Sequence, residues 1–246
     1  MRIVLIADAY PPFRSSGAVQ LRDLAKEFVR QGHKITVLVA SPDLDENWNT
    51  NIEDGVFVVR LKSPKTKDIG YVKRTIGEFF MPLFMLLNLR RSGVMTKYWD
   101  GVVWYSPTIF LGPIVNVLKK ISGCRSYLII RDIFPEWAAD MGLMGRGLRY
   151  RFFKTIANYQ YSVADVIGVQ TPGNLGHFSA WFAKSRGRLE VLHNWLAPAP
   201  NLGCSISIAK TRLAGRKIFV YDANTTFLSQ CNRQPALGDG IHGRRN

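Results

Sequence analysis

The first forty residues constrain the fold most, because they contain a strand, a loop, a helix and a second strand in unbroken order. Residues 2–7 form an apolar run, rich in β-branched side chains and short enough to be a strand buried on both faces. Along residues 19–30 the apolar side chains recur three and four positions apart, which predicts a helix with one apolar stripe. Gly32 follows the last periodic residue, as is common at helix C-termini, and residues 34–40 form a second apolar run. The pattern predicts a βαβ unit.

The loop between the first strand and the helix, Asp8 to Ser16, contains the first candidate site. Pro11 and Pro12 in this loop cannot continue a buried strand. Ligands of parallel sheets bind at the carboxyl ends of the strands, where the N–H groups of a helix start attract anions. A dinucleotide site would require Gly-x-Gly-x-x-Gly directly after the strand, whereas this loop and the helix start that follows it contain Gly17 alone. We therefore exclude an NAD site here.

Strands and helices continue to alternate along the chain to about residue 192. Residues 41–54 are polar and acidic, and we expect them to be a connection without regular structure. Apolar runs predict further strands at 56–61, 100–105, 126–130, 165–170 and 189–192. Periodic segments predict helices at 109–121 and at 148–163, and a third that opens at Thr171-Pro172. The order predicts an α/β fold, a Rossmann-like three-layer domain with a mostly parallel sheet.

Polar side chains follow several of these strands and are candidates for a ligand site. Arg131 and Asp132 come directly after the strand at 126–130. Asp132 either lines a ligand site or caps the next helix, and the residues alone leave both interpretations open. His193 follows the last strand, where a single histidine is more often structural than catalytic.

The loop and the first helix resemble a known family. Residues 9–18 (AYPPFRSSGA), Leu24-Ala25 and the GHKITV segment at 32–37 are similar to the N-terminal domain of retaining family 4 glycosyltransferases with the GT-B fold. The resemblance is strongest to bacterial O-antigen and capsule sugar transferases. Residues 131–136 (RDIFPE) match the pattern Arg-Asp-hydrophobic-hydrophobic-Pro-Glu. A strand that ends in this pattern recurs in transferases of O-antigen amino sugars of the fucosamine type, which these residues resemble.

The resemblance implies roles for several residues. Ser16, Gly17 and Ala18 would form the loop that approaches the donor phosphates and the acceptor, and Arg131 and Asp132 would be catalytic. Further cleft residues would be Ser106, Glu136 and Asn194. The resemblance also implies a nucleotide sugar donor and a polyprenyl-linked or saccharide acceptor, with no metal ion and no other cofactor.

The same resemblance predicts the domain organisation. Residues 1–196 would be the acceptor-side domain, and 197–221 a linker with the first strand of an incomplete C-terminal domain. Residues 222–246 show no helical or strand period, and we expect them to arise from a reading-frame shift. Relatives hold the nucleotide in a second Rossmann-like domain, so we expect this chain to be inactive in glycosyl transfer on its own.

Residues 79–87 form an apolar block that is far shorter than the roughly 20 residues needed to span a bilayer. The block is apolar on every side, contains Pro82 and has basic flanks, so it is either covered by protein or inserted at a membrane surface. Both interpretations remain open. Membrane binding would use Phe79, Phe80, Leu83 and Phe84, with Lys73, Arg74, Arg90 and Arg91 facing an anionic inner-membrane surface.

The formal charge of +15 over 246 residues indicates an acidic partner, which could be nucleic acid, an anionic membrane or a phosphorylated substrate. No nucleic-acid-binding motif is present, so we expect no nucleic acid partner. Cys124, Cys204 and Cys231 have no zinc spacing, and their odd number favours a reducing compartment. We expect a cytoplasmic protein, peripheral on the inner face of the cytoplasmic membrane. The alternative to an enzyme is a non-catalytic remnant that binds a membrane surface or a lipid carrier.

Overall fold

The computed structural model describes residues 1–13, 15–96, 98–184, 187–195, 197–198, 211–212 and 214–216. The chain separates into two units, Met1–Ala197 and Pro198–Asn246. The helices and strands discussed below belong to the first unit. Apart from residues 197–198, 211–212 and 214–216, the predicted linker and first strand at 197–221 lie outside the described residues, and so does the predicted tail at 222–246.

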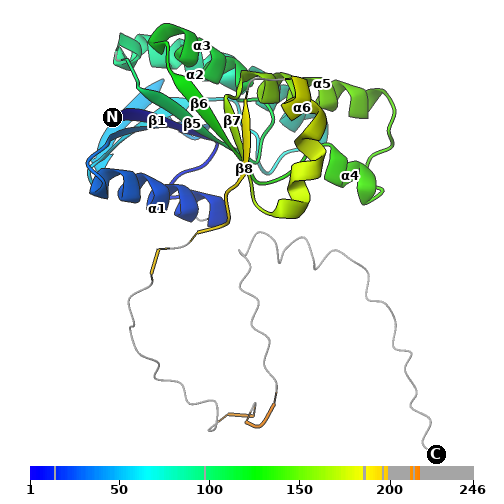
Figure 1. Cartoon of the computed structure of the whole chain (residues 1–246). Helices are drawn as coiled ribbons and strands as arrows, with labels where there is room; N and C mark the ends of the chain where they lie inside the picture. The colour runs from blue at the N-terminus through cyan, green and yellow to red at the C-terminus, as the bar shows by residue number, and fades with distance from the viewer. Residues whose placement is uncertain are drawn as a thin grey trace, which may run out of the picture. The chain divides into compact units, whose positions relative to one another are not determined.

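The described residues form an eight-stranded sheet with the strand order β3-β4-β2-β1-β5-β6-β7-β8 (Figure 1). Neighbouring strands are parallel except for β3 and β4, and Val4 in β1 lies opposite Thr36 on one side and Val102 on the other. The predicted α/β fold with a mostly parallel sheet is confirmed. The strands are β1 Arg2–Ala7, β2 Lys34–Ser41, β3 Trp48–Glu53, β4 Val56–Lys62, β5 Gly101–Ser106, β6 Arg125–Ile130, β7 Val166–Val169 and β8 Arg188–Val191.

Helices cover both faces of the sheet and complete the three layers (Figure 1). On one face lies α1, Ser16–Arg30, and on the other lie α2, Tyr71–Arg91, α3, Gly112–Ser122, and α5, Leu148–Val163. Shorter elements are α4 at Glu136–Asp140, α6 at Ser179–Lys184 and the 3-10 turns at Val94–Thr96 and Pro172–Phe178. The helix predicted to open at Thr171-Pro172 therefore begins as a 3-10 turn.

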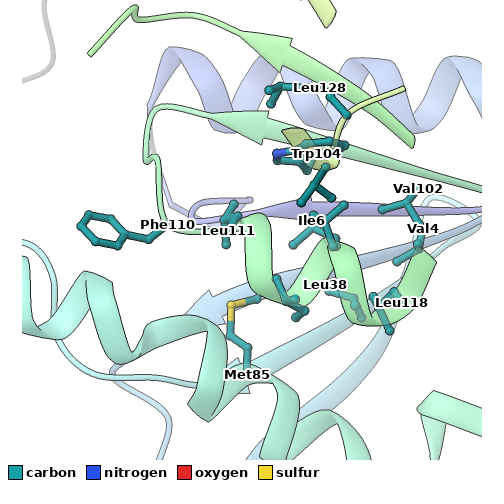
Figure 2. Close-up of a cluster of buried hydrophobic side chains, with 14 of the residues drawn as sticks. Val4, Ile6, Leu38, Met85, Val102, Trp104, Phe110, Leu111, Leu118 and Leu128 are labelled. Atoms are coloured by element: carbon teal, nitrogen blue, oxygen red, sulfur yellow. The ribbon is translucent and has the colours of Figure 1, made fainter. Parts of the chain in front are cut away.

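Side chains alternate across β1, so this strand contributes to the cores on both faces. Val4 and Ile6 belong to the larger core, which lies under α2, α3 and α5. Ile3 and Leu5 belong to the smaller core, which lies against α1. Figure 2 shows the larger core, where side chains of β1, β2, β5 and β6 meet Met85 of α2, Leu118 of α3 and Leu111, which directly precedes α3. Burial on both faces explains why the central strands are continuous apolar runs.

Strand β3 corrects the prediction that residues 41–54 are an irregular connection. β3 and β4 form an antiparallel hairpin in which Trp48 lies opposite Leu61. Asp54 and Gly55 form its turn with φ values of 52° and 78°, the left-handed conformations that favour Asp-Gly in two-residue hairpins. β3 is a mostly exposed edge strand in which Trp48 and Ile52 share one face with Thr50 and only Trp48 packs against the core, so its hydrophobic alternation is short and weak. The Asp-Gly dipeptide is the signal that identifies it.

Helix α2 contains the apolar block at 79–87, which protein covers on one side of the helix only. Met81, Met85 and Leu89 are buried in the larger core, together with Pro82. On the opposite side of the helix, apolar side chains are between 40% and 49% exposed. These are Phe80, Leu83, Phe84 and Leu87. None of the helices among the described residues is both long enough and apolar enough to cross a membrane.

Candidate active site

A hollow of about 420 Å³ lies at the carboxyl ends of β1, β5 and β6, and we call it the central hollow. The N-terminus of α1 and side chains near the start of α2 complete its wall. In open sheets of parallel strands this edge is where ligands bind, because the loops there are free to vary while the strands stay fixed. The βαβ unit predicted from the first forty residues thus supplies one side of the hollow.

The N-terminus of α1 gives the central hollow an electropositive edge. The Ser15 side chain caps the helix, its Oγ accepting a hydrogen bond of 3.2 Å from the Ala18 N–H. Ser16, Gly17 and Ala18, which the resemblance assigns to a phosphate-binding loop, all line the hollow. A Cβ atom at Gly17 would lie 3.0 Å from two atoms of the Tyr105 side chain, so only glycine fits without displacing that ring. The backbone N–H groups of the first helical turn are the natural ligands for an anion here.

Three carboxyl groups line the central hollow, and each has its pKa raised by burial. The desolvation of Asp8 raises its pKa, although Lys67, with Nζ 3.7 Å from Oδ2, opposes the shift. Burial likewise raises the pKa of Glu78, against the effect of Arg74, whose Nε lies 2.8 Å from Glu78 Oε1. The pKa of Asp132 is raised by burial as well. Carboxyl groups with raised pKa values are suited to accepting or holding a proton at a reaction centre.

The charges that line the central hollow balance. Three basic side chains, Lys67, Arg74 and Arg131, face the three carboxyl groups. Burial also raises the pKa of Tyr105 to about 12, so its hydroxyl remains protonated at neutral pH. No group of three or more metal-ligating side chains occurs among the described residues. The hollow is therefore suited to a polar ligand with many hydroxyl groups.

Arg131 joins the hollow to the chain segment that follows β8. Its Nη1 donates a hydrogen bond of 2.8 Å to Gln20 Oε1 on α1 and contacts the Oδ1 of Asn194. Trp195 lies beside this pair, and its Nε1 donates to the Gln20 backbone oxygen at 2.9 Å. Asn194 thus lies next to the hollow and acts on it through Arg131.

Two residues predicted for the cleft do not line the central hollow. Ser106 is buried, and its Oγ accepts a hydrogen bond of 2.8 Å from Gln160 on α5. Strand alternation explains this position, because Tyr105 faces the hollow and the next side chain must face the opposite helices. Glu136 lies at the start of α4 and pairs with Lys154 on α5.

Several lining residues lie outside the candidate set that sequence reasoning identified. Asp8 is the first residue after β1, so the rule that singled out Asp132 after β6 could also have found it. Lys67 and Glu78 come from the segment after β4 and from α2, and no local pattern marks them. Arg74, predicted to face a membrane, lies instead in the hollow beside Glu78.

No family model matches this chain. Over 160 residues it is 27% identical to the Escherichia coli K12 protein WcaI, which is named as a colanic acid biosynthesis glycosyl transferase. The match covers 60% of this chain and 38% of WcaI, so the chain spans well under half of that relative.

Solved structures resemble the chain at low sequence identity. Sucrose-phosphate synthase from Thermosynechococcus elongatus superposes with a TM-score of 0.61 and 12% identity, over 78% of this chain and 47% of that enzyme. A UDP-glucosyltransferase from Polygonum tinctorium gives a TM-score of 0.53 and 11% identity, over 95% of this chain and 57% of the other. The chain therefore has the fold of one half of a GT-B glycosyltransferase.

Proposed function

We propose that residues 1–197 are the acceptor-side half of a glycosyltransferase that acts in polysaccharide or O-antigen biosynthesis. The observation that carries the proposal is the central hollow, where an electropositive helix start lies beside three carboxyl groups whose pKa values are raised. The likeness to WcaI supports the same class of reaction. The donor would be a nucleotide sugar and the acceptor a saccharide or a polyprenyl-linked sugar, as the resemblance implies.

In this proposal the acceptor hydroxyl binds among the carboxyl groups of the central hollow. Asp132 holds the hydroxyl and takes up its proton as the oxygen bonds to the anomeric carbon of the donor. The bond from that carbon to the nucleotide diphosphate breaks, and the leaving phosphate carries away its electron pair. The N–H groups of Ser16 and Gly17 stabilise the developing negative charge. Arg131 keeps Asp132 oriented through its contacts to Gln20 and Asn194.

A hollow on one half of the enzyme offers a nucleotide sugar few contacts, because relatives of this type bind the nucleotide on the second domain. We therefore propose that the chain alone transfers no sugar and binds nucleotide sugars weakly. Isothermal titration calorimetry with UDP-glucose and UDP-N-acetylglucosamine tests this point. Micromolar affinity, which requires about 8 kcal/mol of binding free energy, would contradict the division of roles between the two halves.

We further propose that the exposed side of α2 rests on the cytoplasmic face of an anionic membrane. Phe80, Leu83, Phe84 and Leu87 form a stripe along the helix, and exposed Arg90 and Arg91 follow in its last turn. Apolar side chains with a cationic rim are typical of interfacial helices. The same surface supports the second candidate function, a non-catalytic module that binds a lipid carrier.

Co-sedimentation with phosphatidylglycerol vesicles tests this surface. The double variant Phe80→Asp/Phe84→Asp should lose binding, because two charges would enter the apolar part of the interface. Phe182→Asp, at a side chain that is 51% exposed on α6, is the matched control and should bind like the original chain. Circular dichroism checks that each variant is folded. If the double variant still sediments with vesicles, α2 does not mediate attachment.

A further inference from the structure

A second hollow, of about 450 Å³, lies beside the central hollow at the carboxyl ends of β1, β2 and β4. We call it the side hollow. Asp8, Ala9, Thr66 and Lys67 line both hollows, so the two are continuous along one edge of the sheet. A ligand with its reactive end in the central hollow could therefore extend into the side hollow. Nothing in the proposed transfer reaction requires this second space.

Lys67 lines both hollows, and Phe13 lies next to it in the wall of the side hollow. The Lys67 Nζ lies 4.0 Å from the centre of the Phe13 ring and 3.7 Å from Asp8 Oδ2. Phe13 is 48% exposed and lines the side hollow. Exposed aromatic faces provide large, rigid contact area to a ligand at low entropic cost. This ring offers a flat apolar surface at the mouth of the side hollow.

A buried hydroxyl group also lines the side hollow. Ser63 follows β4, is 7% exposed, and its Oγ has no hydrogen-bond partner among the described residues. Buried polar atoms are nearly always paired, so this hydroxyl, which exposes almost no surface, is available to a ligand group once the Ser63 side chain rotates toward the hollow. The group must be able to donate or accept a hydrogen bond, as a sugar hydroxyl can.

The charges in the side hollow exclude a phosphate group as the main ligand. Arg60, Lys65 and Lys67 are balanced by Asp8, Asp43 and Asp68. The most buried of these cations, Arg60, is already engaged by Glu53 Oε1 at 2.8 Å and by the Pro11 backbone oxygen at 2.6 Å. A phosphate would need an excess of positive charge or bidentate arginine contacts, and neither is provided. A neutral ligand with hydroxyl groups and one apolar face fits this environment.

We propose that the side hollow binds the second sugar ring of a saccharide acceptor whose terminal ring occupies the central hollow. The ring would lie against Phe13 and hydrogen bond to Ser63 Oγ. This inference rests on the proposed function, since it assumes a saccharide acceptor in the central hollow. It adds that the site recognises at least two neutral sugar units and discriminates acceptors by length.

Amide-resolved NMR of the full chain tests the inference. Neutral methyl glycosides of glucose, galactose, fucose and N-acetylglucosamine would each be titrated as the monosaccharide and as disaccharides that end in it. The best disaccharide should bind about tenfold more tightly than its terminal monosaccharide, equivalent to about 1.4 kcal/mol. Its amide shifts should include Phe13 and Ser63, while the monosaccharide should shift Gly17 and Thr108 in the central hollow.

Two variants and one control locate the effect. Phe13→Ala should remove most of the tenfold preference for the disaccharide, and Ser63→Ala should reduce it about threefold, with monosaccharide affinity unchanged in both. Phe182→Ala, at an equally exposed aromatic side chain on α6, should keep the full preference. Equal affinity for both lengths, or an unchanged preference in Phe13→Ala, would overturn the inference and leave the proposed function standing. Absence of shifts in either hollow with every glycoside would overturn both.

Discussion

Substituting Gly77 with alanine should destabilise the domain, although alanine is the better helix former. Gly77 is buried within α2, and a Cβ atom at this position would lie 2.6 Å from the backbone oxygen of Lys65. This distance is far inside normal contact, and a backbone oxygen cannot rotate away as a side chain can. The helix and the segment that carries Lys65 must therefore move apart.

Two opposing effects set the size of this change in stability. Replacing glycine by alanine inside a helix gains about 1 kcal/mol. Overpacking of a closely packed site costs about 1–3 kcal/mol, and a clash with backbone lies towards the upper end of that range. The Gly77→Ala variant should therefore lose about 1–2 kcal/mol of unfolding free energy, a substantial part of the 5–15 kcal/mol typical of a domain.

Urea unfolding followed by circular dichroism measures this difference for Gly77→Ala. Lys73→Ala, an exposed substitution on the same helix, is the control and should change stability by only a few tenths of a kcal/mol. The segment displaced from α2 continues into Thr66 and Lys67, so saccharide affinity should also fall in Gly77→Ala. A variant as stable as the original chain, or more stable, would show that α2 does not pack against the Lys65 backbone and would refute this argument.

Two further substitutions test the packing of the sheet away from the hollows. Burial tends to raise the pKa of Asp165, but hydrogen bonds from Lys119 and Ser126 outweigh it and lower the pKa, so Asp165→Asn should cost about 1 kcal/mol at pH 7. In acid titrations followed by fluorescence this difference should shrink as the pH falls below about 4, where the unfolded carboxylate takes up its proton first, and should vanish once the folded carboxylate is protonated as well. A difference that does not depend on pH would contradict that assignment. Gly168→Ala would place a Cβ atom 2.3 Å from the Tyr127 hydroxyl and should lower the thermal midpoint, whereas Gly168→Ala/Tyr127→Leu should recover part of the loss because the clashing ring is gone. An additive loss in the double variant would contradict the clash.

The sequence predicted the central strands because burial on both faces makes them continuous apolar runs. The strand at 34–40 and the helix after Gly17 are examples, since the residues themselves mark both the interior and the ends of each element. Strand β3 was not predictable in this way, because an exposed edge strand such as Trp48–Glu53 forms no continuous apolar run. Its local signals are the short alternation of Trp48 and Ile52 with polar residues and the turn at Asp54-Gly55.

The sequence predicted where the candidate site lies more readily than which residues line it. Residues directly after strands, such as Asp132, lie at the predicted edge because parallel strands end there together. Lys67 and Glu78 reach the hollow through the packing of α2 and of the segment before it, which depends on contacts between distant parts of the chain. Ser106 was predicted to line the site but does not, because successive side chains of β5 face opposite sides of the sheet and Tyr105 is the one that faces the hollow.

Saccharide binding in the central hollow is the central claim, and a glycan array probed with the full chain and with Asp132→Asn tests it most directly. The original chain should bind a subset of the arrayed bacterial saccharides, and Asp132→Asn should bind the same subset about tenfold more weakly, because an amide accepts the hydrogen bond of a sugar hydroxyl less well than a carboxylate does. Phe182→Ala should reproduce the original pattern. Binding to no saccharide on the array, or equal binding by Asp132→Asn, would contradict the assignment of this hollow to an acceptor.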